Sequence, residues 1–177
     1  RGPVMVYYGQ ELGEPADVGA AGFELDKGRT TFFDYWSVPT LIQWMNHGKY
    51  DGGGLPDLNR ELRSFYGRLL HSLTHPALAQ GNFLPLNPAN THNPSYVVSG
   101  GRKEPGRWLY SFLRYDPVSK RSLLVVANLH PKSTASDVKL KLSEEASKFL
   151  ALAPESTLVG SDLLSETPTS WQTPAKD

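Results

Sequence analysis

The 177-residue sequence contains no cysteine, so disulfides, thiolate metal sites and thiol catalysis are excluded. It also lacks an excess of either charge, because eighteen basic side chains balance eighteen acidic ones. A nucleic-acid-binding protein carries a basic patch or stripe, and this sequence has no long block of one sign. No apolar run approaches the roughly 18 residues that a membrane-spanning helix needs. We therefore expect neither a nucleic-acid partner nor a membrane span.

The beginning of the chain combines a short apolar run with a polar turn. Residues Pro3 to Tyr8 are mainly apolar, and the turn from Gly9 to Glu14 follows directly. A short continuous apolar run is typical of a strand covered on both faces, and the loop after such a strand carries polar groups that meet a ligand. The pattern predicts a buried strand followed by a rim loop, in which Gln10 and Glu11 hold the loop by hydrogen bonds.

The hydrophobic periodicity changes near Gly81. Before it, apolar residues at a spacing of three or four predict a helix from Asp57 to Leu73, with Asp57 as the N-cap. After it, Asn87 to Gly106 is dense in Asn, Pro and Gly and is expected to be mostly loop. Alternating residues predict strands at Trp108–Arg114, Leu123–Leu129, Val138–Leu142 and Thr157–Leu164. The second of these strands is nearly all apolar and is expected to be central, and no closing strand is evident after the last.

Several segments together resemble the α-amylase family of glycoside hydrolases over roughly residues 1–150. The stretch from Gly2 to Glu11, with its Tyr-Tyr-Gly-Gln-Glu run, resembles the eighth strand of that family's β/α barrel, and Asp26 to Trp36 resembles the loop after it. The predicted helix matches the barrel's closing helix, while Tyr110–Tyr115 and Leu124–Leu129 resemble the first paired strands of the C-terminal β-domain. The resemblance implies a mixed α and β fold. Residues 1–80 would be a remnant of a β/α barrel (last strand and helix), followed by an antiparallel all-β sandwich in residues 81–177.

By this resemblance, we expect the chain to be the C-terminal part of a retaining glycosidase or transglycosidase that acts on α-linked glucans such as starch and maltooligosaccharides. The family's three catalytic carboxylates lie upstream of Arg1, so no catalytic residue is expected here and the fragment alone is expected to be inactive. The implied partners are the upstream barrel segment and an α-glucan. No cofactor is expected in the fragment, and calcium is a candidate cofactor of the full enzyme. The alternative is a self-standing β-sandwich that binds carbohydrate or stabilises its neighbour.

The loop after the predicted first strand contains the candidate sugar contacts. In the family, an aspartate and an arginine of this loop can hydrogen-bond a sugar beyond the cleavage point, which indicates Asp26 and Arg29. A carboxylate beside a planar guanidinium suits vicinal hydroxyls, although an ordinary surface ion pair is the alternative. Tyr35, with Trp36 beside it, is a candidate for stacking on a pyranose face, against the alternative that both rings belong to the core.

Acidic residues near the rim loop imitate an active site. A retaining glycosidase uses two carboxyl groups about 5 Å apart. Four acidic residues lie in or near the rim loop and can imitate such a pair: Glu11, Glu14, Asp17 and Asp26. We expect support of the loop rather than catalysis, because a polar turn at a barrel rim needs internal hydrogen-bond partners.

His71 and His75 stand four residues apart, a spacing that on one helix face can hold a metal ion. No third ligand is evident, so no metal site is expected. The alternative is a pair of polar-face histidines near the helix end, where the dipole favours positive charge. Asp51 precedes three glycines, but no Lys-Ser or Lys-Thr pair follows them, which excludes a phosphate-binding loop.

The predicted first strand would lack its barrel neighbours in this chain. Val4, Met5 and Val6 would then offer apolar faces and unpaired backbone groups, a combination that favours pairing with another chain. We expect Pro3 to Tyr8 to pair with a second chain or to fold back onto the β-domain, and we expect the fragment to self-associate.

Overall fold

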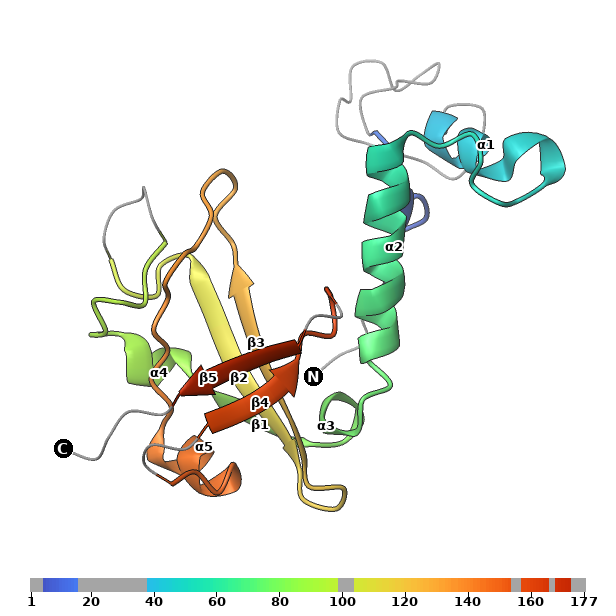
Figure 1. The fold of residues 1–177 in the computed structure, drawn as a ribbon. Coiled ribbons are helices and arrows are strands. Elements are labelled where there is room, and N and C mark those ends of the chain that lie inside the picture. Colours follow the sequence, from blue (N-terminus) through green and yellow to red (C-terminus); the bar gives the residue numbers. More distant parts are fainter. Residues whose placement is uncertain (1–4, 16–37, 99–103, 154–156, 166–167, 173–177) are drawn as a thin grey trace. The chain divides into compact units, whose positions relative to one another are not determined.

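The computed structural model describes residues 5–15, 38–98, 104–153, 157–165 and 168–172. Within them the fold mixes α and β, as expected, and contains an antiparallel three-stranded sheet (Figure 1). The chain divides into two compact units, Arg1–Leu70 and His71–Asp177. This division lies inside a helix, earlier than the predicted domain boundary between residues 80 and 81. In the described part, no helix is long and apolar enough to cross a membrane.

The first unit is helical in its described part. Its elements are η1 Gln10–Leu12, α1 Pro39–Met45, η3 Asn46–Gly48 and α2 Asp57–Ser72, of which α2 continues into the second unit. The helix predicted from Asp57 is thereby confirmed, but the N-cap prediction is wrong: Asp57 is the first residue of α2, and the Arg60 N–H donates to Pro56 O at 3.1 Å. The apolar side chains buried here are Leu12, Val38 and Leu55, whereas α2 contributes no buried residue.

Met5 to Tyr8, the described part of the predicted first strand, lies in neither sheet. The Tyr7 N–H, which a neighbouring strand would use, donates instead to Gln10 Oε1 at 3.2 Å. Pro3 and Val4 lie outside the described residues. The strand prediction is wrong for Met5 to Tyr8, and these residues do not fold back into the β-domain's sheets. A strand needs a neighbouring strand to take its backbone hydrogen bonds, and none of the described strands pairs with Met5 to Tyr8.

The second unit contains the three-stranded sheet and a separate hairpin. Its elements are α3 Pro76–Ala79, β1 Asn82–Pro85, α4 Asn87–Asn90, β2 Leu109–Asp116, β3 Arg121–Asn128, α5 Glu144–Phe149, β4 Thr157–Ser161 and β5 Pro168–Gln172. β1, β2 and β3 are antiparallel neighbours in that order, and β4 pairs antiparallel with β5. The strands predicted from Trp108, Leu123 and Thr157 correspond to β2, β3 and β4.

The sheets differ from the sequence-based expectation in three respects. β2 is central rather than the more apolar β3, because β1 pairs with its other edge. Hydrophobic alternation misses β1, which has four residues and includes Asn82 and Pro85. It also misses β5, the strand that pairs with β4. Val138–Leu142 is extended with alternating burial but belongs to neither sheet.

One face of β2 carries the core of the second unit. Leu109, Ser111 and Leu113 alternate as buried residues along it. Leu113 packs in a cluster with Leu84, Leu86 and Ala146, and this cluster also contacts Leu140, Leu142, Phe149 and Leu150. Leu109 packs in a second cluster with Tyr96 and Val98, which contacts Trp108, Ala135, Val138 and Leu140. Leu140 joins both clusters, so the extended segment from Val138 to Leu142 covers the sheet although it pairs with no strand.

Two buried asparagine amides take the place of a strand beside this extended segment. Asn90 Nδ2 donates to Lys141 O at 2.9 Å, and Asn90 Oδ1 accepts from Lys141 N–H at 2.8 Å. Asn93 Nδ2 donates to Lys139 O at 2.7 Å and to Asn90 Oδ1 at 2.8 Å. Asn90 also donates to Leu86 O at 2.8 Å. The Asn90 amide thus fills both donor and both acceptor positions, which removes the penalty for burying it.

A third asparagine extends the sheet from the same loop. Asn87 Nδ2 donates to Leu109 O at 2.8 Å, and Asn87 Oδ1 accepts from Ser111 N–H at 2.7 Å, so the amide pairs with β2 beyond the end of β1. The buried Tyr96 hydroxyl donates to Ser111 Oγ at 2.7 Å. The segment from Asn87 is largely free of regular structure, as expected, but it is a hydrogen-bonded part of the core.

We expect Asn90→Ala to destabilise the second unit by about 2 to 4 kcal/mol, because the partners of a fully used buried amide would lose their hydrogen bonds. Asn82→Ala is the matched control, since the Asn82 side chain is exposed and its loss should change stability by no more than about 0.5 kcal/mol. Native-state amide exchange in β2 and β3 measures both changes. Equal effects at the two positions would contradict the role given to Asn90.

Candidate functional site

The rim loop is a tight turn built on two glycines. Gly9 and Gly13 have φ values of 83° and 68°, and the Glu14 N–H donates to Gly9 O at 2.9 Å. A Cβ on Gly9 would lie 2.8 Å from Glu14 Cβ, which is closer than real Cβ contacts come. Both the backbone conformation and the lack of space therefore require glycine at position 9.

Hydrogen bonds connect the rim loop to α2. Gln10 Nε2 donates to Tyr66 Oη at 2.8 Å while Gln10 Oε1 accepts from the Tyr7 N–H. Asn59 Nδ2 donates to Leu12 O at 2.6 Å. Gln10 has the contacts that a loop-supporting residue would make, whereas Glu11 makes no side-chain hydrogen bond to the described residues. The supporting role of both residues stays a prediction.

Glu14 caps a helix instead of pairing with another acid. Its carboxylate accepts from the Leu41 N–H at 2.9 Å and from the Thr40 N–H at 3.4 Å, at the first turn of α1. The N-cap residue Val38 has no side chain able to do this, so a carboxylate from an earlier segment satisfies the free N–H groups and meets the positive end of the helix. Sequence reading misses this role because the two partners are distant in the chain.

The candidate sugar contacts lie outside the described residues. Asp26, Arg29, Tyr35 and Trp36 all belong to residues 16–37, as does Asp17 of the acidic group. Their roles remain expectations.

The segment between α1 and α2 has an unusual backbone. Asn46, His47 and Tyr50 have φ values of 43°, 56° and 55°, a left-handed conformation that residues with a Cβ seldom adopt. Asp51 Oδ1 accepts from Asn46 Nδ2 at 2.7 Å and from the Gly53 N–H at 2.8 Å. These hydrogen bonds lower the pKa of Asp51, and the one from Asn46 has the largest effect. The three glycines after Asp51 thus form a braced turn, not a flexible linker.

An aromatic and cationic group lies beside this turn. The Tyr50 ring meets the Trp44 ring edge-on with centroids 5.9 Å apart, and the Arg63 guanidinium lies over Trp44 at 5.3 Å. Tyr50 is 57% exposed, whereas Trp44 is partly buried. The sequence gives no signal for this grouping, because it depends on the left-handed backbone at Tyr50.

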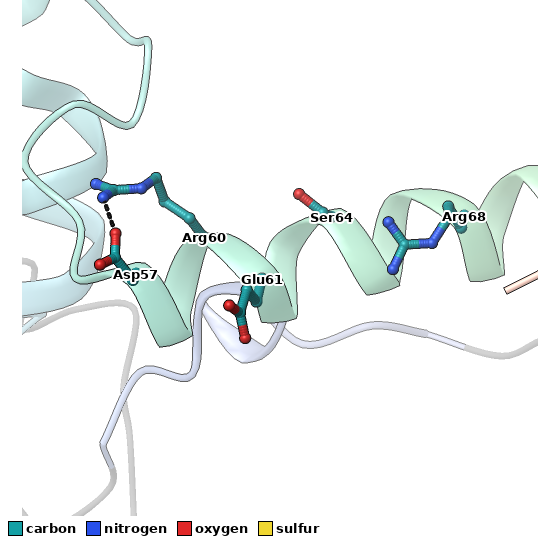
Figure 2. A pocket seen from close by; sticks show the side chains of 5 residues that line it. All are labelled: Asp57, Arg60, Glu61, Ser64 and Arg68. Atoms are coloured by element: carbon teal, nitrogen blue, oxygen red, sulfur yellow. Dashed lines mark hydrogen bonds and ion pairs between the residues drawn. The ribbon is translucent and has the colours of Figure 1, made fainter. Parts of the chain in front are cut away.

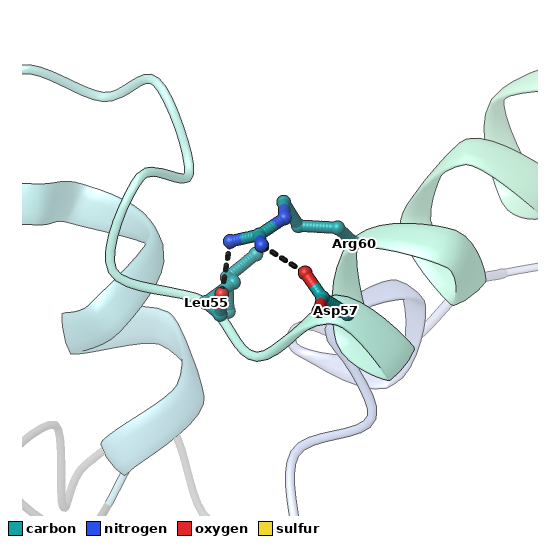
Figure 3. Close-up of polar contacts among 3 residues, drawn as sticks. All are labelled: Leu55, Asp57 and Arg60. Carbon is teal, nitrogen blue, oxygen red and sulfur yellow. Dashed lines mark hydrogen bonds and ion pairs between the residues drawn. The ribbon is translucent and has the colours of Figure 1, made fainter.

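A hollow of about 470 Å³ lies along the polar side of α2. Figure 2 shows the side chains that line it, namely Asp57, Arg60, Glu61, Ser64 and Arg68. All five come from a single helix, so the hollow lacks the convergent groups from several elements that a catalytic cleft presents. Figure 3 shows that Arg60 donates to Leu55 O and to the Asp57 carboxylate, which braces the start of α2.

His71 and His75 do not share a helix face. α2 ends at Ser72, and His75 is the N-cap of α3, where its Nδ1 accepts from the Ala77 N–H at 3.3 Å. Burial, with a smaller contribution from the charge of Arg121, lowers the pKa of His75. The expectation of two histidines whose positive charge a helix end favours is therefore wrong for His75, which lies at the beginning of a helix. The described residues contain no group of three metal-ligating side chains.

Comparison with known proteins adds no relative. No protein-family model matches this chain, and no curated protein or solved structure shows significant similarity to it.

We expect the second unit to lose stability as the pH falls through the region below 6.5, the ordinary pKa of histidine. In the folded state the pKa of His75 lies below its value in the unfolded chain, so the unfolded chain binds a proton at a higher pH. Between these two pKa values, each fall in pH favours the unfolded state; below the folded pKa the effect levels off. His75→Asn keeps a capping side chain without a titrating group and should reduce this slope relative to the unchanged chain. Thermal unfolding across this pH range tests the prediction, and identical slopes in the variant and the unchanged chain would refute it.

Proposed function

We propose that this chain is the C-terminal part of an α-amylase-like retaining glycosidase or transglycosidase that acts on α-linked glucans. The observation that supports the proposal is the order of its motifs along the chain. The run Tyr7-Tyr8-Gly9-Gln10-Glu11 comes first, the segment Asp26–Trp36 second, and the amphipathic helix from Asp57 third, followed by the apolar strands. A mixed fold in which α2 precedes an antiparallel sheet is compatible with this order.

In this proposal, residues 1–80 complete a β/α barrel and residues 81–177 form a β-sandwich. α2 would be the closing barrel helix, and the β1–β2–β3 sheet and the β4–β5 hairpin would belong to the two layers of the sandwich. The upstream segment would supply the nucleophile, the acid/base and the third carboxylate. Asp26 and Arg29 would hydrogen-bond a sugar beyond the cleavage point, and Tyr35 would stack on it. Calcium is a candidate cofactor of the full enzyme.

A self-standing carbohydrate-binding domain is the second candidate, favoured by a row of aromatic rings on the sheet. The rings of Phe83 and Phe112 have centroids 5.1 Å apart, and those of Phe112 and Tyr110 are 5.7 Å apart. Phe83 and Tyr110 are 41% and 44% exposed. The flat apolar face of an aromatic ring can stack on a sugar ring, and the tyrosine hydroxyl adds a polar group beside it.

The chain and its upstream reading frame together test the enzyme proposal. We expect purified residues 1–177 to release no reducing sugar from soluble starch or maltoheptaose, because no catalytic carboxylate is present. We expect the longer product of the reading frame to hydrolyse or transfer these substrates. An upstream sequence without three acidic barrel residues, or activity in residues 1–177, would overturn the proposal. The binding domain would be favoured by two results together: amylopectin in a native gel retards residues 1–177, and the longer product of the reading frame is inactive.

In the longer enzyme, Arg29→Ala tests the proposed sugar contact. The KM for maltoheptaose should rise about tenfold, the effect of losing roughly 1.4 kcal/mol of binding, while kcat changes little. Lys27→Ala is a control that removes a neighbouring positive charge. Parallel assays with a shorter maltooligosaccharide show whether the loss depends on chain length. Unchanged KM and kcat on the long substrate would remove Arg29 from the sugar site.

A further inference from the structure

The helix α2 has an exposed apolar stripe, which we define as Leu58, Phe65 and Leu69. These side chains are 76%, 37% and 36% exposed, and no residue of the helix is buried. At 3.6 residues per turn the three positions lie within about 40° of one another around the helix axis. An amphipathic helix normally gains most of its stability by packing such a stripe. We therefore expect another apolar surface to cover this stripe.

The two sides of the α2 stripe differ in what they contact. On one side, Asn59 and Tyr66 hydrogen-bond the rim loop, and Leu62 lies against Gly13, where an added Cβ would be 3.1 Å from Leu62 Cδ2. On the other side lie Glu61 and Arg68, which line the hollow in Figure 2. They are seven residues apart, so they lie too far apart along the helix for a direct pair, which forms at a spacing of three or four.

We propose that the α2 helix of a second copy of this chain covers the α2 stripe in an antiparallel, two-fold symmetric pair. In that arrangement Leu58 of each copy lies beside the partner's Leu69, and Phe65 lies beside the partner's Leu62 near the axis. The same side of both helices comes together, because a two-fold axis between antiparallel helices maps each side onto itself. Glu61 of each copy then meets the partner's Arg68, with an offset of about 3 Å along the helix.

The order of the charges along α2 supports a second copy as the partner. A parallel two-fold pair would turn the Glu61 and Arg68 side of one helix away from the same side of its partner, whereas the antiparallel pair brings these two sides together and forms two opposite-charge contacts. A guanidinium has five N–H donors, so Arg68 can serve the partner's Glu61 in addition to contacts within its own chain. The first unit also keeps its rim loop on the opposite side of the stripe, away from these contacts.

The proposed pair is small. A helix of 16 residues is about 24 Å long, so the pair buries less than the roughly 1,600 Å² of a standard interface. We expect a concentration-dependent equilibrium between monomer and dimer. This association concerns residues 1–177 alone and does not rest on the proposed glucan activity. In the longer enzyme of that proposal the barrel would cover the α2 stripe, so the pair is expected only for the chain without the upstream segment. It also differs from association through Pro3–Tyr8, since it depends on side chains of α2.

Sedimentation equilibrium over a dilution series tests the proposal with charge variants. Glu61→Arg alone and Arg68→Glu alone should each weaken dimerisation by at least about tenfold, because each homodimer then contains two like-charge contacts. A mixture of these two single variants should restore dimerisation as a heterodimer, and so should the chain that carries both substitutions. Glu145→Arg on α5, an acid-to-base change at an exposed position, is the control and should leave the equilibrium unchanged.

The heterodimer is the decisive readout, because misfolding of a variant cannot produce it. Circular dichroism of each single variant confirms that α2 is present. A wild-type chain that remains monomeric at the highest soluble concentration would overturn the proposal. A dimer that all the charge variants leave unchanged would also overturn it, since it would use another surface. Glucan hydrolysis by the longer enzyme is assayed separately, so failure of the dimer and failure of the proposed function give different results.

Discussion

The second unit depends on the side-chain amides of three asparagines spaced three residues apart, Asn87, Asn90 and Asn93. Asn87 bonds the backbone of β2, whereas the other two bond the extended segment at Lys139 and Lys141. The amides connect two backbone segments that no strand joins directly. Because each amide combines donors and an acceptor, it can replace the N–H and C=O pair of a missing strand.

This polar network determines how the apolar core closes. Leu140 contacts both hydrophobic clusters, and the amides of Asn90 and Asn93 hold the backbone on either side of it beside the loop. A buried network of this kind is favourable when every group is satisfied and strongly unfavourable when one is left out. The position of Leu140, and with it the packing of the two clusters, therefore depends on correct pairing of polar groups in a region whose composition predicts a loop.

The sequence predicts the elements that depend on a local residue pattern. It does not predict features that depend on contacts between residues distant in the chain. The periodic leucines give α2, and alternation gives β2 and β3, including the buried face at Leu109, Ser111 and Leu113. β1 is missed because four residues with a proline carry too little periodicity, and the central position of β2 follows from that hidden neighbour. Likewise, a polar rim loop is predictable at Gln10, but helix capping by Glu14 is not, because its partners at Thr40 and Leu41 are brought near only by folding.

The left-handed turn between α1 and α2 limits which residues evolution can place there. Asn46 belongs to the few side chains that tolerate this conformation, but His47 and Tyr50 hold it at an energetic disadvantage of about 1 kcal/mol each. Drift toward glycine or asparagine would be accepted at these positions, whereas β-branched residues would be rejected even though the side chains face solvent. Substitution tolerance in this surface segment would thus follow backbone handedness rather than exposure, and a screen based on burial alone would misjudge it.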